Sequence, residues 1–345
     1  MQFAGKVWRL LVGIKDGLVL LFMLLFFSAL FAVLTARPSP AAARDGALLL
    51  DLNGVVVEER TRIDPLEALL SGQTPIGEYQ ARDVIHALDE AAGDERISAV
   101  VLDLDRFMGG GQVHLQEIGE ALDRVRAAEK PVLAYATAYS DDGMLLAAHA
   151  SEVWVNPMGG AVVAGPGGER LYYAGLLDRL NVSAEIEQFY EYKNAPNVYK
   201  ETGYTEPHRE AMTALADSIW TTSLEDISAD RGLDAAVVRE AMSSGPMSPE
   251  RMIEVGLADK LGWPEDVMDA ARERAGEGSQ ILDILEYKPA GAPIGSKTIA
   301  VVGGEGAIVT GGPSGDIFGG GPAFASDMIA SAILEAGRDD DVAAL

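Results

Sequence analysis

The chain has 345 residues, 48% of them hydrophobic and 23% charged, which is typical of a globular protein with one large or two medium domains. Its 53 acidic residues outnumber its 27 basic residues and give a net charge of −26. No cluster of Lys and Arg is present to neutralise phosphates, which excludes nucleic acid as a partner. The absence of cysteine excludes disulfides, thiolate metal sites and a cysteine nucleophile. The four histidines lack metal-ligand spacing, so we predict no metal and no other cofactor.

The first predicted element is a membrane anchor. Residues 17–36 (GLVLLFMLLFFSALFAVLTA) carry no charge and have the length, about 20 residues, that a helix needs to cross a bilayer. Lys6, Arg9 and Lys15 precede this segment, which favours a cytoplasmic amino terminus and an exported body. A cleaved signal peptide is the alternative, but the apolar core of such peptides is only about 7 to 15 residues long. We therefore expect a single-pass protein of the inner (cytoplasmic) membrane with its bulk on the periplasmic side.

Strands and helices alternate in the part of the chain that follows. Ala47 to Glu58 (ALLLDLNGVVVE) predicts a strand, a turn at Asn53-Gly54 and a second strand, whereas residues 61–80 predict a loop. The run ISAVVLDL at 97–104 is too apolar to have a solvent face, which indicates a parallel-rich sheet covered on both sides. Together these features predict an α/β fold. The other expected elements are helices over 82–92 and 143–150, a helix after the RFMGGGQ loop at 106–112, and strands over 131–136 and 152–155.

The middle of the chain leads to a lysine that follows an apolar run. Residues 159–168 are rich in glycine and predict a loop, Arg170 to Leu180 predicts an amphipathic helix, and Ser183 to Phe189 alternates like a strand that ends just before Lys193. A mostly helical region comes next and would cover one face of the sheet or project as a subdomain. Its predicted helices span 207–231, 237–242 and 250–255.

Two segments of the chain repeat one pattern. IAVVGGEGAI at 299–308 has the pattern of ALLLDLNGVV at 47–56, and ASDMIASAILEAGRDDDVAAL at 325–345 has that of ARDVIHALDEAAGDERISAVVL at 81–102. The second copy stops inside what should be a buried strand, so we expect that about half of a two-repeat protein lies outside this sequence. The predicted domains are a cytoplasmic terminus (1–16), the anchor (17–36), a linker (37–46), a first, lysine-bearing repeat with a helical covering segment (47–290) and the truncated start of a second repeat (298–345).

Several motifs occur in the order known from one family. They are VVLDL followed by MGGGQ, KPVLAYATAYSDDGMLLAAHASEVWVNPMG at 130–159, LYYAGLLDRLNV at 171–182, and YKNAP around Lys193. Together with the anchor they resemble signal peptide peptidase A of the long type, a family of membrane-bound Ser-Lys peptidases. The resemblance implies a ClpP/crotonase-like repeat fold and runs over nearly the whole chain.

The resemblance also implies roles for residues and partners. Lys193 matches the family's general base, which takes a proton from the nucleophilic serine and returns it, while that serine belongs to the second repeat and is absent from this chain. A lysine acts as a base only when neutral, and burial in an apolar pocket lowers its pKa. The implied protein is a serine endopeptidase that digests cleaved, hydrophobic signal peptides at the membrane. The family further implies a homo-oligomer, with a tetramer expected, and this chain alone is expected to be inactive.

Three further features are candidate parts of a site. Ser140 is a secondary candidate for the nucleophile, but Asp141 and Asp142 follow it where the catalytic repeat has glycines, and their charges would repel a developing oxyanion. Gly109 to Gly111 precedes a helix, so it either binds an anion through its amides or forms a tight turn. Lys200 is a rival of Lys193, although its surroundings are polar and typical of a surface.

Two other functions stay open. The chain is alternatively a catalytically silent membrane-anchored scaffold or a truncated product, since its own repeat has the Asp141-Asp142 pair in place of a competent serine segment. A third option is an acyl-CoA enzyme of the crotonase type, which would hold an enolate with glycine amides. The anchor and the export signal argue against it, because coenzyme A chemistry is cytoplasmic.

Overall fold

The computed structural model describes residues 13, 15–28, 46–61, 76–276, 278–284, 286–287, 297–304, 306–312 and 323–345. The chain divides into two compact units, Met1–Arg44 and Asp45–Leu345.

The described part of the first unit is a helix over 15–28. Its large apolar side chains, from Leu18 to Phe27, are exposed. No helix within the described ranges is both long and apolar enough to cross a bilayer. The expected anchor over 17–36 continues into residues 29–36, which lie outside the described residues.

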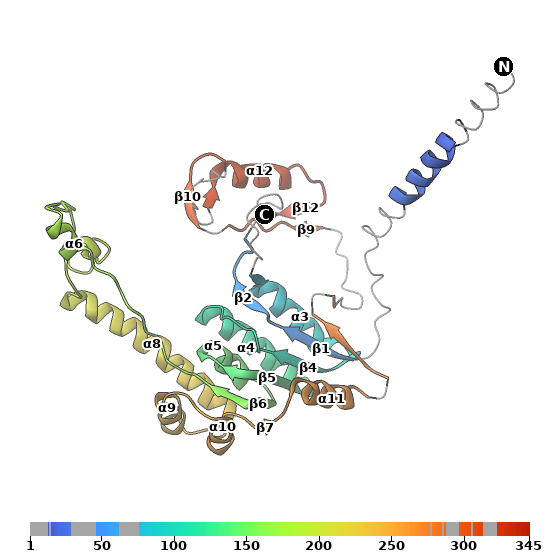
Figure 1. Cartoon of the computed structure of the whole chain (residues 1–345), viewed down its shortest axis with the longest axis horizontal. Helices are drawn as coiled ribbons and strands as arrows, with labels where there is room; N and C mark the ends of the chain where they lie inside the picture. Colours follow the sequence, from blue (N-terminus) through green and yellow to red (C-terminus); the bar gives the residue numbers. More distant parts are fainter. Residues whose placement is uncertain are drawn as a thin grey trace. The chain divides into compact units, whose positions relative to one another are not determined.

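A six-stranded sheet with every neighbouring pair parallel forms the centre of the second unit (Figure 1). The strand order is β7-β6-β5-β4-β1-β8. Its apolar strands cannot leave a face in water, which is why the parallel arrangement predicted from the run at 97–104 is correct. The strands are β1 Gly46–Asp51, β4 Ile97–Asp103, β5 Val132–Tyr139, β6 Glu152–Ala161, β7 Lys260–Leu261 and β8 Gln280–Asp283.

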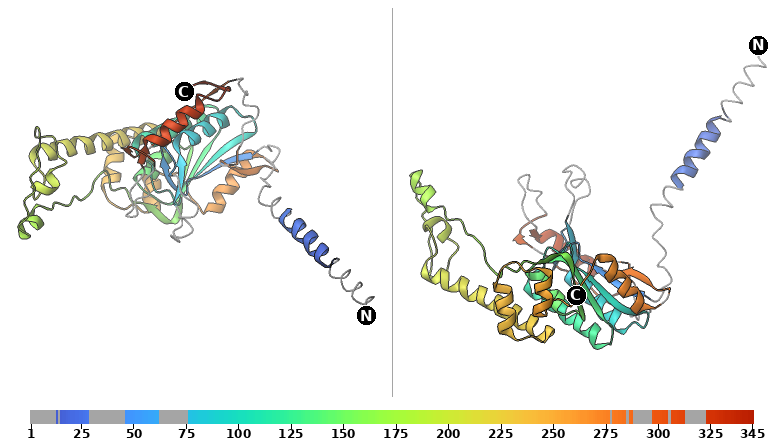
Figure 2. Two further views of the ribbon diagram at one scale, coloured as in Figure 1. Left: turned by 90° about the horizontal axis from the view of Figure 1, so that it is seen from above. Right: turned by 60° about the horizontal axis from the view of Figure 1, so that its bottom comes forward.

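Helices cover both faces of this sheet (Figures 1 and 2). On one face, Val100 and Leu102 of β4 join a core with α3 (Ala81–Gly93), α4 (Gln112–Ala127) and α5 (Asp141–Ala148). On the other face, Ala99 and Val101 pack with Val267 and Ala271 of α11 (Pro264–Ala275). Alternate residues of one strand thus enter opposite cores, as the period of two in a strand requires.

The residues that follow β1 in the sequence form a small, separate pair of parallel strands. β2 (Gly54–Val57) pairs with β3 (Gly77–Gln80), and the predicted turn at Asn53-Gly54 separates β1 from β2. The prediction of a loop over residues 61–80 is wrong for β3, whose residues GEYQ are too few and too polar to show a strand period. Residues 62–75 lie outside the described residues.

The same order of elements recurs near the end of the chain. β10 (Ala307–Val309) pairs in parallel with β11 (Ala323–Ala325), as β2 does with β3. β9 (Thr298–Ile299) pairs in parallel with β12 (Val342–Ala344), as β1 does with β4. Between these strands lies α12 (Ser326–Ala336), which buries none of its residues. The proposed repeat boundaries stay a prediction.

A long helix connects the core to the segment around Lys193. α8 (Glu206–Arg231) has 26 residues and, at 1.5 Å per residue, is about 39 Å long. Its carboxyl-terminal part packs on the core through Leu224 and Ile227, and α9 (Ala235–Ser243) and α10 (Pro249–Val255) follow it. These three helices match the predicted ones closely.

The segment before α8 differs from the prediction. Ser183 to Phe189 is not a strand, because it has no partner strand and most of its side chains are exposed. The predicted helix over 170–180 is shortened to α6 (Ala174–Arg179), and a second short helix, α7 (Asn197–Lys200), precedes α8. The predicted loop over 159–168 begins later than expected, since β6 continues to Ala161 and pairs with the end of β5.

A partly buried ion pair fixes the turn between α3 and β4 to the segment that follows β8 at the edge of the sheet. Asp94 accepts a hydrogen bond from Arg96 Nε at 2.8 Å and one from the Tyr287 hydroxyl at 2.8 Å. The Arg96 guanidinium holds the pKa of Asp94 well below its usual range. The Asp94 side chain is only 8% exposed, so these contacts are little screened by water.

We predict that Asp94→Asn lowers the free energy of unfolding by about 1.5–3 kcal/mol at pH 7 in urea titrations. Because the folded-state pKa lies below the unfolded value of about 3.9, the contribution is present above that pH and is lost as the pH falls toward the folded pKa. Asp89→Asn is the matched control. Its partner Arg124 lies 2.7 Å away, but both side chains are more than 40% exposed, so the expected change is below about 1 kcal/mol. Equal effects of the two substitutions would contradict the assignment.

Candidate active site

Local hydrogen bonds to the backbone, and not pairing with a strand, hold the segment that carries Lys193. The Lys193 amide donates to the Tyr190 carbonyl at 3.4 Å, and Gln188 Nε2 donates to the Lys193 carbonyl at 2.8 Å. Tyr192 then connects the segment to α8, because its hydroxyl donates to Glu210 Oε2 at 2.7 Å. This hydrogen bond raises the pKa of Tyr192. The lysine is therefore presented by a short turn fixed to the first turns of α8.

The Lys193 side chain lies at an exposed hollow. Its ammonium has no hydrogen-bond or ion-pair partner within the described part of the chain. Three neighbouring aromatic rings are exposed as well, with Phe189 at 75%, Tyr190 at 85% and Tyr192 at 52%. The hollow has a volume of about 320 Å³ and is lined by residues 187–189 and 192–196. In the single chain the run before Lys193 packs on no core, so it does not bury the lysine.

Lys200 differs from Lys193 in its contacts. Its ammonium donates to Gln188 Oε1 at 3.3 Å and lies 3.5 Å from the Ile186 carbonyl. Lys200 thus supports the backbone of the same segment. Of the two lysines, only Lys193 has a side chain left free for chemistry.

Ser140 is used as a helix cap. It lies at the end of β5, and its Oγ accepts a hydrogen bond from the Gly143 amide at 3.3 Å at the start of α5. None of the hydrogen bonds and ion pairs of the described residues joins it to a lysine or histidine that would act as its base. The hollow at Lys193 is lined only by its own segment, so the structure does not bring Lys193 and Ser140 together.

The two aspartates after Ser140 occupy backbone amides that would otherwise bind an anion. Asp142 Oδ2 accepts from the Gly110 amide at 3.1 Å. Asp141 accepts from the amides of Ala164 at 3.0 Å and Gly165 at 2.7 Å. These carboxylates place fixed negative charge beside the amides, where it would repel a developing oxyanion. This arrangement agrees with a structural role for the segment.

The glycine loop at 109–111 is a turn. Gly109 and Gly111 have φ angles of 105° and 77°, which favour glycine. The loop also pairs with β2, since the Val56 amide donates to the Gly109 carbonyl at 2.9 Å and the Met108 amide to the Gly54 carbonyl at 2.8 Å. With the Gly110 amide already bonded to Asp142, the geometry favours the turn and leaves this amide unable to hold an enolate.

One buried polar cluster was not predicted from the sequence. His149 Nδ1 lies 3.0 Å from Asp123 Oδ2 and 3.0 Å from Asp230 Oδ2, and Arg126 lies 3.0 Å from Asp123 Oδ1. Burial raises the pKa of Asp230. His149 Nε2 faces Gly119 and has no partner, so the Nδ1 proton lies between the two carboxylates. Arg126 supplies the positive charge that these carboxylates need, so the cluster is complete without a metal ion. Its contacts tie α4, α5 and α8 together. Asp230 is 81 residues from His149 in the chain, and no spacing rule connects them.

Comparison with known proteins shows which proteins this chain is similar to. Residues 124–277, which include Lys193, match the model of peptidase family S49. The chain is 28% identical to "Protease 4" of Salmonella typhi over 364 residues, which is 99% of this chain and 58% of that protein. It is 22% identical to "Serine protease SPPA, chloroplastic" of Arabidopsis thaliana over 58% of this chain and 29% of that protein. The resemblance to signal peptide peptidase A-type peptidases is therefore confirmed, and the chain spans little more than half the length of the first relative.

The similarity to solved structures is weaker than the similarity to these sequences. A variant of the "1510-N membrane-bound stomatin-specific protease" matches with a TM-score of 0.37 and 8% identity, covering 66% of this chain and 84% of that one. A similarity this low carries no argument.

We predict that Ser140→Ala lowers the free energy of unfolding by about 0.5–2 kcal/mol in urea titrations, because a helix loses its amino-terminal cap. Ser183→Ala is the control, since Ser183 is exposed and should leave stability unchanged. The chain should not react with a fluorophosphonate probe through Ser140, which has no base beside it. Labelling that disappears in Ser140→Ala would show that Ser140 is a nucleophile after all.

Proposed function

We propose that the chain is the lysine-bearing repeat of a membrane-anchored serine endopeptidase that digests cleaved signal peptides. Lys193 acts as the general base, and a second repeat supplies the nucleophilic serine. The observation that carries the proposal is the match of residues 124–277 to peptidase family S49, with an unbonded lysine inside that range. A repeat fold of the ClpP and crotonase type and a single-pass anchor at 17–36 in the inner membrane are parts of the same proposal.

The proposed reaction requires Lys193 to be less exposed to water than it is in the single chain. A serine hydroxyl attacks a peptide carbonyl only as a base takes its proton, and a lysine is such a base only when neutral. Lys193 is exposed in the single chain, so a partner must exclude water from it in the active protein. The exposed rings of Phe189 and Tyr192 line the same hollow as Lys193, and Tyr190 is exposed in the same segment, so one partner surface would cover them together.

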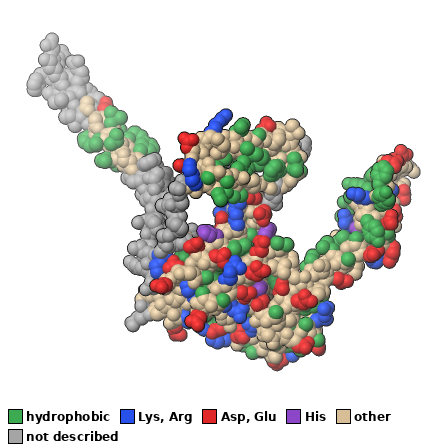
Figure 3. Space-filling model, turned by 180° about the vertical axis from the view of Figure 1, so that it is seen from behind, with side chains coloured by type: hydrophobic (Ala, Val, Ile, Leu, Met, Phe, Trp, Pro, Cys, Tyr) green, Lys and Arg blue, Asp and Glu red, His purple; other side chains and the backbone are tan. Residues whose placement is uncertain are grey.

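This requirement supports an oligomer. A second copy or a second repeat that packs on the three rings would exclude water from Lys193 and place a serine beside it. Figure 3 shows hydrophobic side chains on the segment that carries α6 and α8, while acidic side chains are spread over the body of the protein. An apolar surface on a protein of net charge −26 supports association through this segment. The family's tetramer is the expected assembly.

The proposed reaction follows directly. Lys193 takes the serine proton as the serine attacks the substrate carbonyl, and it then gives this proton to the leaving amine. Water next attacks the acyl-enzyme with Lys193 again as the base. Substrates are apolar, extended peptides reached from the membrane side.

The alternative of a silent scaffold is favoured by one specific observation. In this repeat, Ser140 is a cap and the aspartates that follow it fill the nearby amides. The two candidates differ in whether Lys193 matters for hydrolysis.

In a protein that contains both repeats, Lys193→Met should lower kcat/KM for an apolar peptide by about 10⁴-fold or more, because the serine loses its base. Lys193→Arg should be equally inactive, since a guanidinium does not deprotonate. Neither substitution should change the thermal midpoint, because the Lys193 ammonium has no contact within the described residues.

Lys200→Met is the matched control for this experiment. Its ammonium lies in the same segment but supports the backbone, so activity should fall by less than about tenfold. Full hydrolysis by the Lys193→Met protein would exclude Lys193 as the base and would favour the scaffold.

A further inference from the structure

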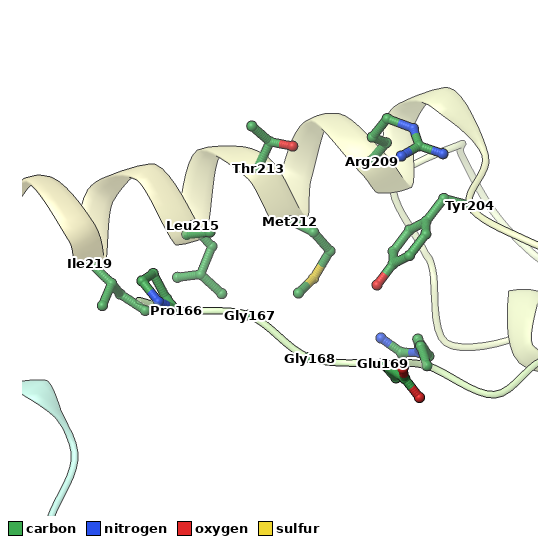
Figure 4. Close-up of a pocket in the computed structure, with 12 residues that line it drawn as sticks. Pro166, Gly167, Gly168, Glu169, Tyr204, Arg209, Met212, Thr213, Leu215 and Ile219 are labelled. Atoms are coloured by element: carbon green, nitrogen blue, oxygen red, sulfur yellow. The ribbon is translucent and has the colours of Figure 1, made fainter. Parts of the chain in front are cut away.

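A groove runs along α8 on the side that faces the glycine-rich segment after β6. It has a volume of about 580 Å³, which is in the range of small-ligand and peptide sites. Figure 4 shows α8 above and the segment below, with Met212, Leu215 and Ile219 directed into the space between them. The groove is lined by residues 166–170, Tyr204, Arg209, Met212, Thr213, Leu215, Ala216 and Ile219.

One wall of the groove is apolar. Met212, Leu215 and Ile219 follow one another at helical spacings of three and four, so they form one stripe on α8. Met212 is 38% exposed and Leu215 is 55% exposed, although a stripe of this kind normally packs on a core. The opposite wall is backbone, because Gly167 and Gly168 carry no side chain and have open space where one would lie. An extended peptide therefore has room between the stripe and the segment.

The amino-terminal end of α8 adds positive charge to the groove. Arg170 and Arg209 both line it, and neither has an acidic partner within the described residues. Arg209 lies over the Tyr204 ring, 5.5 Å from its centroid. Arg170 lies 3.5 Å from Nε2 of His208, which is only 1% exposed. Burial and the charge of Arg170 lower the pKa of His208, so this histidine remains a neutral neighbour.

Glu169 is the one acidic side chain in the lining, so it balances only one of the two guanidinium charges. Guanidinium groups pair strongly with carboxylates through parallel hydrogen bonds. The groove is thus apolar along its length and cationic near one end.

We propose that this groove binds an apolar peptide segment by its free carboxyl terminus, with the α-carboxylate at Arg170 and Arg209 and the apolar side chains on the α8 stripe. The inference rests on the proposed function, because a signal peptide released by cleavage has an apolar core and a newly formed α-carboxylate. Such a site recognises the cleaved end of a peptide and ignores the same sequence inside an intact chain. It holds substrate apart from Lys193, whose own hollow is lined by other residues.

The test is a binding measurement that needs no hydrolysis. The probe is the peptide LLALAA with fluorescein on its amino terminus, prepared once with a free carboxylate and once with a carboxamide. Fluorescence anisotropy is measured with the whole 345-residue chain in mild detergent. The acid should bind about fivefold more tightly than the amide, since one charged contact in a partly exposed site is of that size.

Matched variants assign the contacts. Arg170→Gln and Arg209→Gln should each weaken binding of the acid about fivefold and leave binding of the amide unchanged. Arg239→Gln is the control, because Arg239 is an exposed arginine of α9 outside the groove, and it should alter neither. Leu215→Asn should weaken both peptides equally. Circular dichroism establishes that each variant is folded.

Equal binding of acid and amide, or no binding of either, would overturn the proposal. So would self-association of the chain that Leu215→Asn abolishes without any peptide binding, since the groove would then hold a second copy. Failure of the proposed function is a separate result. In that case the acid binds selectively while Lys193→Met leaves hydrolysis by the two-repeat protein unchanged. This result would support the groove as a peptide site and exclude Lys193 as the base.

Discussion

An all-parallel sheet of apolar strands has to exclude water from both faces, and the rest of the second unit depends on that constraint. Residues of β4 alternate between a core with α3, α4 and α5 and a core with α11. Parallel strands also end at one edge, so the turns after β1, β4 and β5 lie together there. Met108 and Val56 join two of these turns through backbone hydrogen bonds. The sheet thus sets the position of the glycine loop at 109–111, and this position does not depend on the binding of an anion.

At that edge the chain supplies its own anions. Asp142 and Asp141 accept hydrogen bonds from the amides of Gly110 and Gly165, so these amides are satisfied within the chain. Ser140 likewise uses its hydroxyl for α5. These polar groups therefore stabilise the fold at this edge. Lys193, the base of the proposed reaction, lies on a separate segment.

The central strands β1, β4, β5 and β6 and the three helices α8 to α10 could be predicted because their apolar residues form strand-like runs or recur with the period of a helix. The strand expected at Ser183 to Phe189 failed because alternation alone does not supply a partner strand, and β3 was missed because four mixed residues show no period. The motif identified Lys193 in the sequence. It did not predict that Lys193 is exposed, because burial depends on what packs against the segment. The cluster of Asp123, His149 and Asp230 needed the three-dimensional contact of α5 with α8.

The 26 residues of α8 do not share one stability. Amides near Leu224 and Ile227 are held by the core, so they exchange with solvent only when the core opens, whereas amides near Met212 exchange after local opening of lower free energy. The segment with Lys193 is attached to the less protected end through Tyr192 and Glu210. A partner that covers Lys193 must therefore supply the free energy that orders this half of the helix, and its measured affinity will be lower than its contact area suggests.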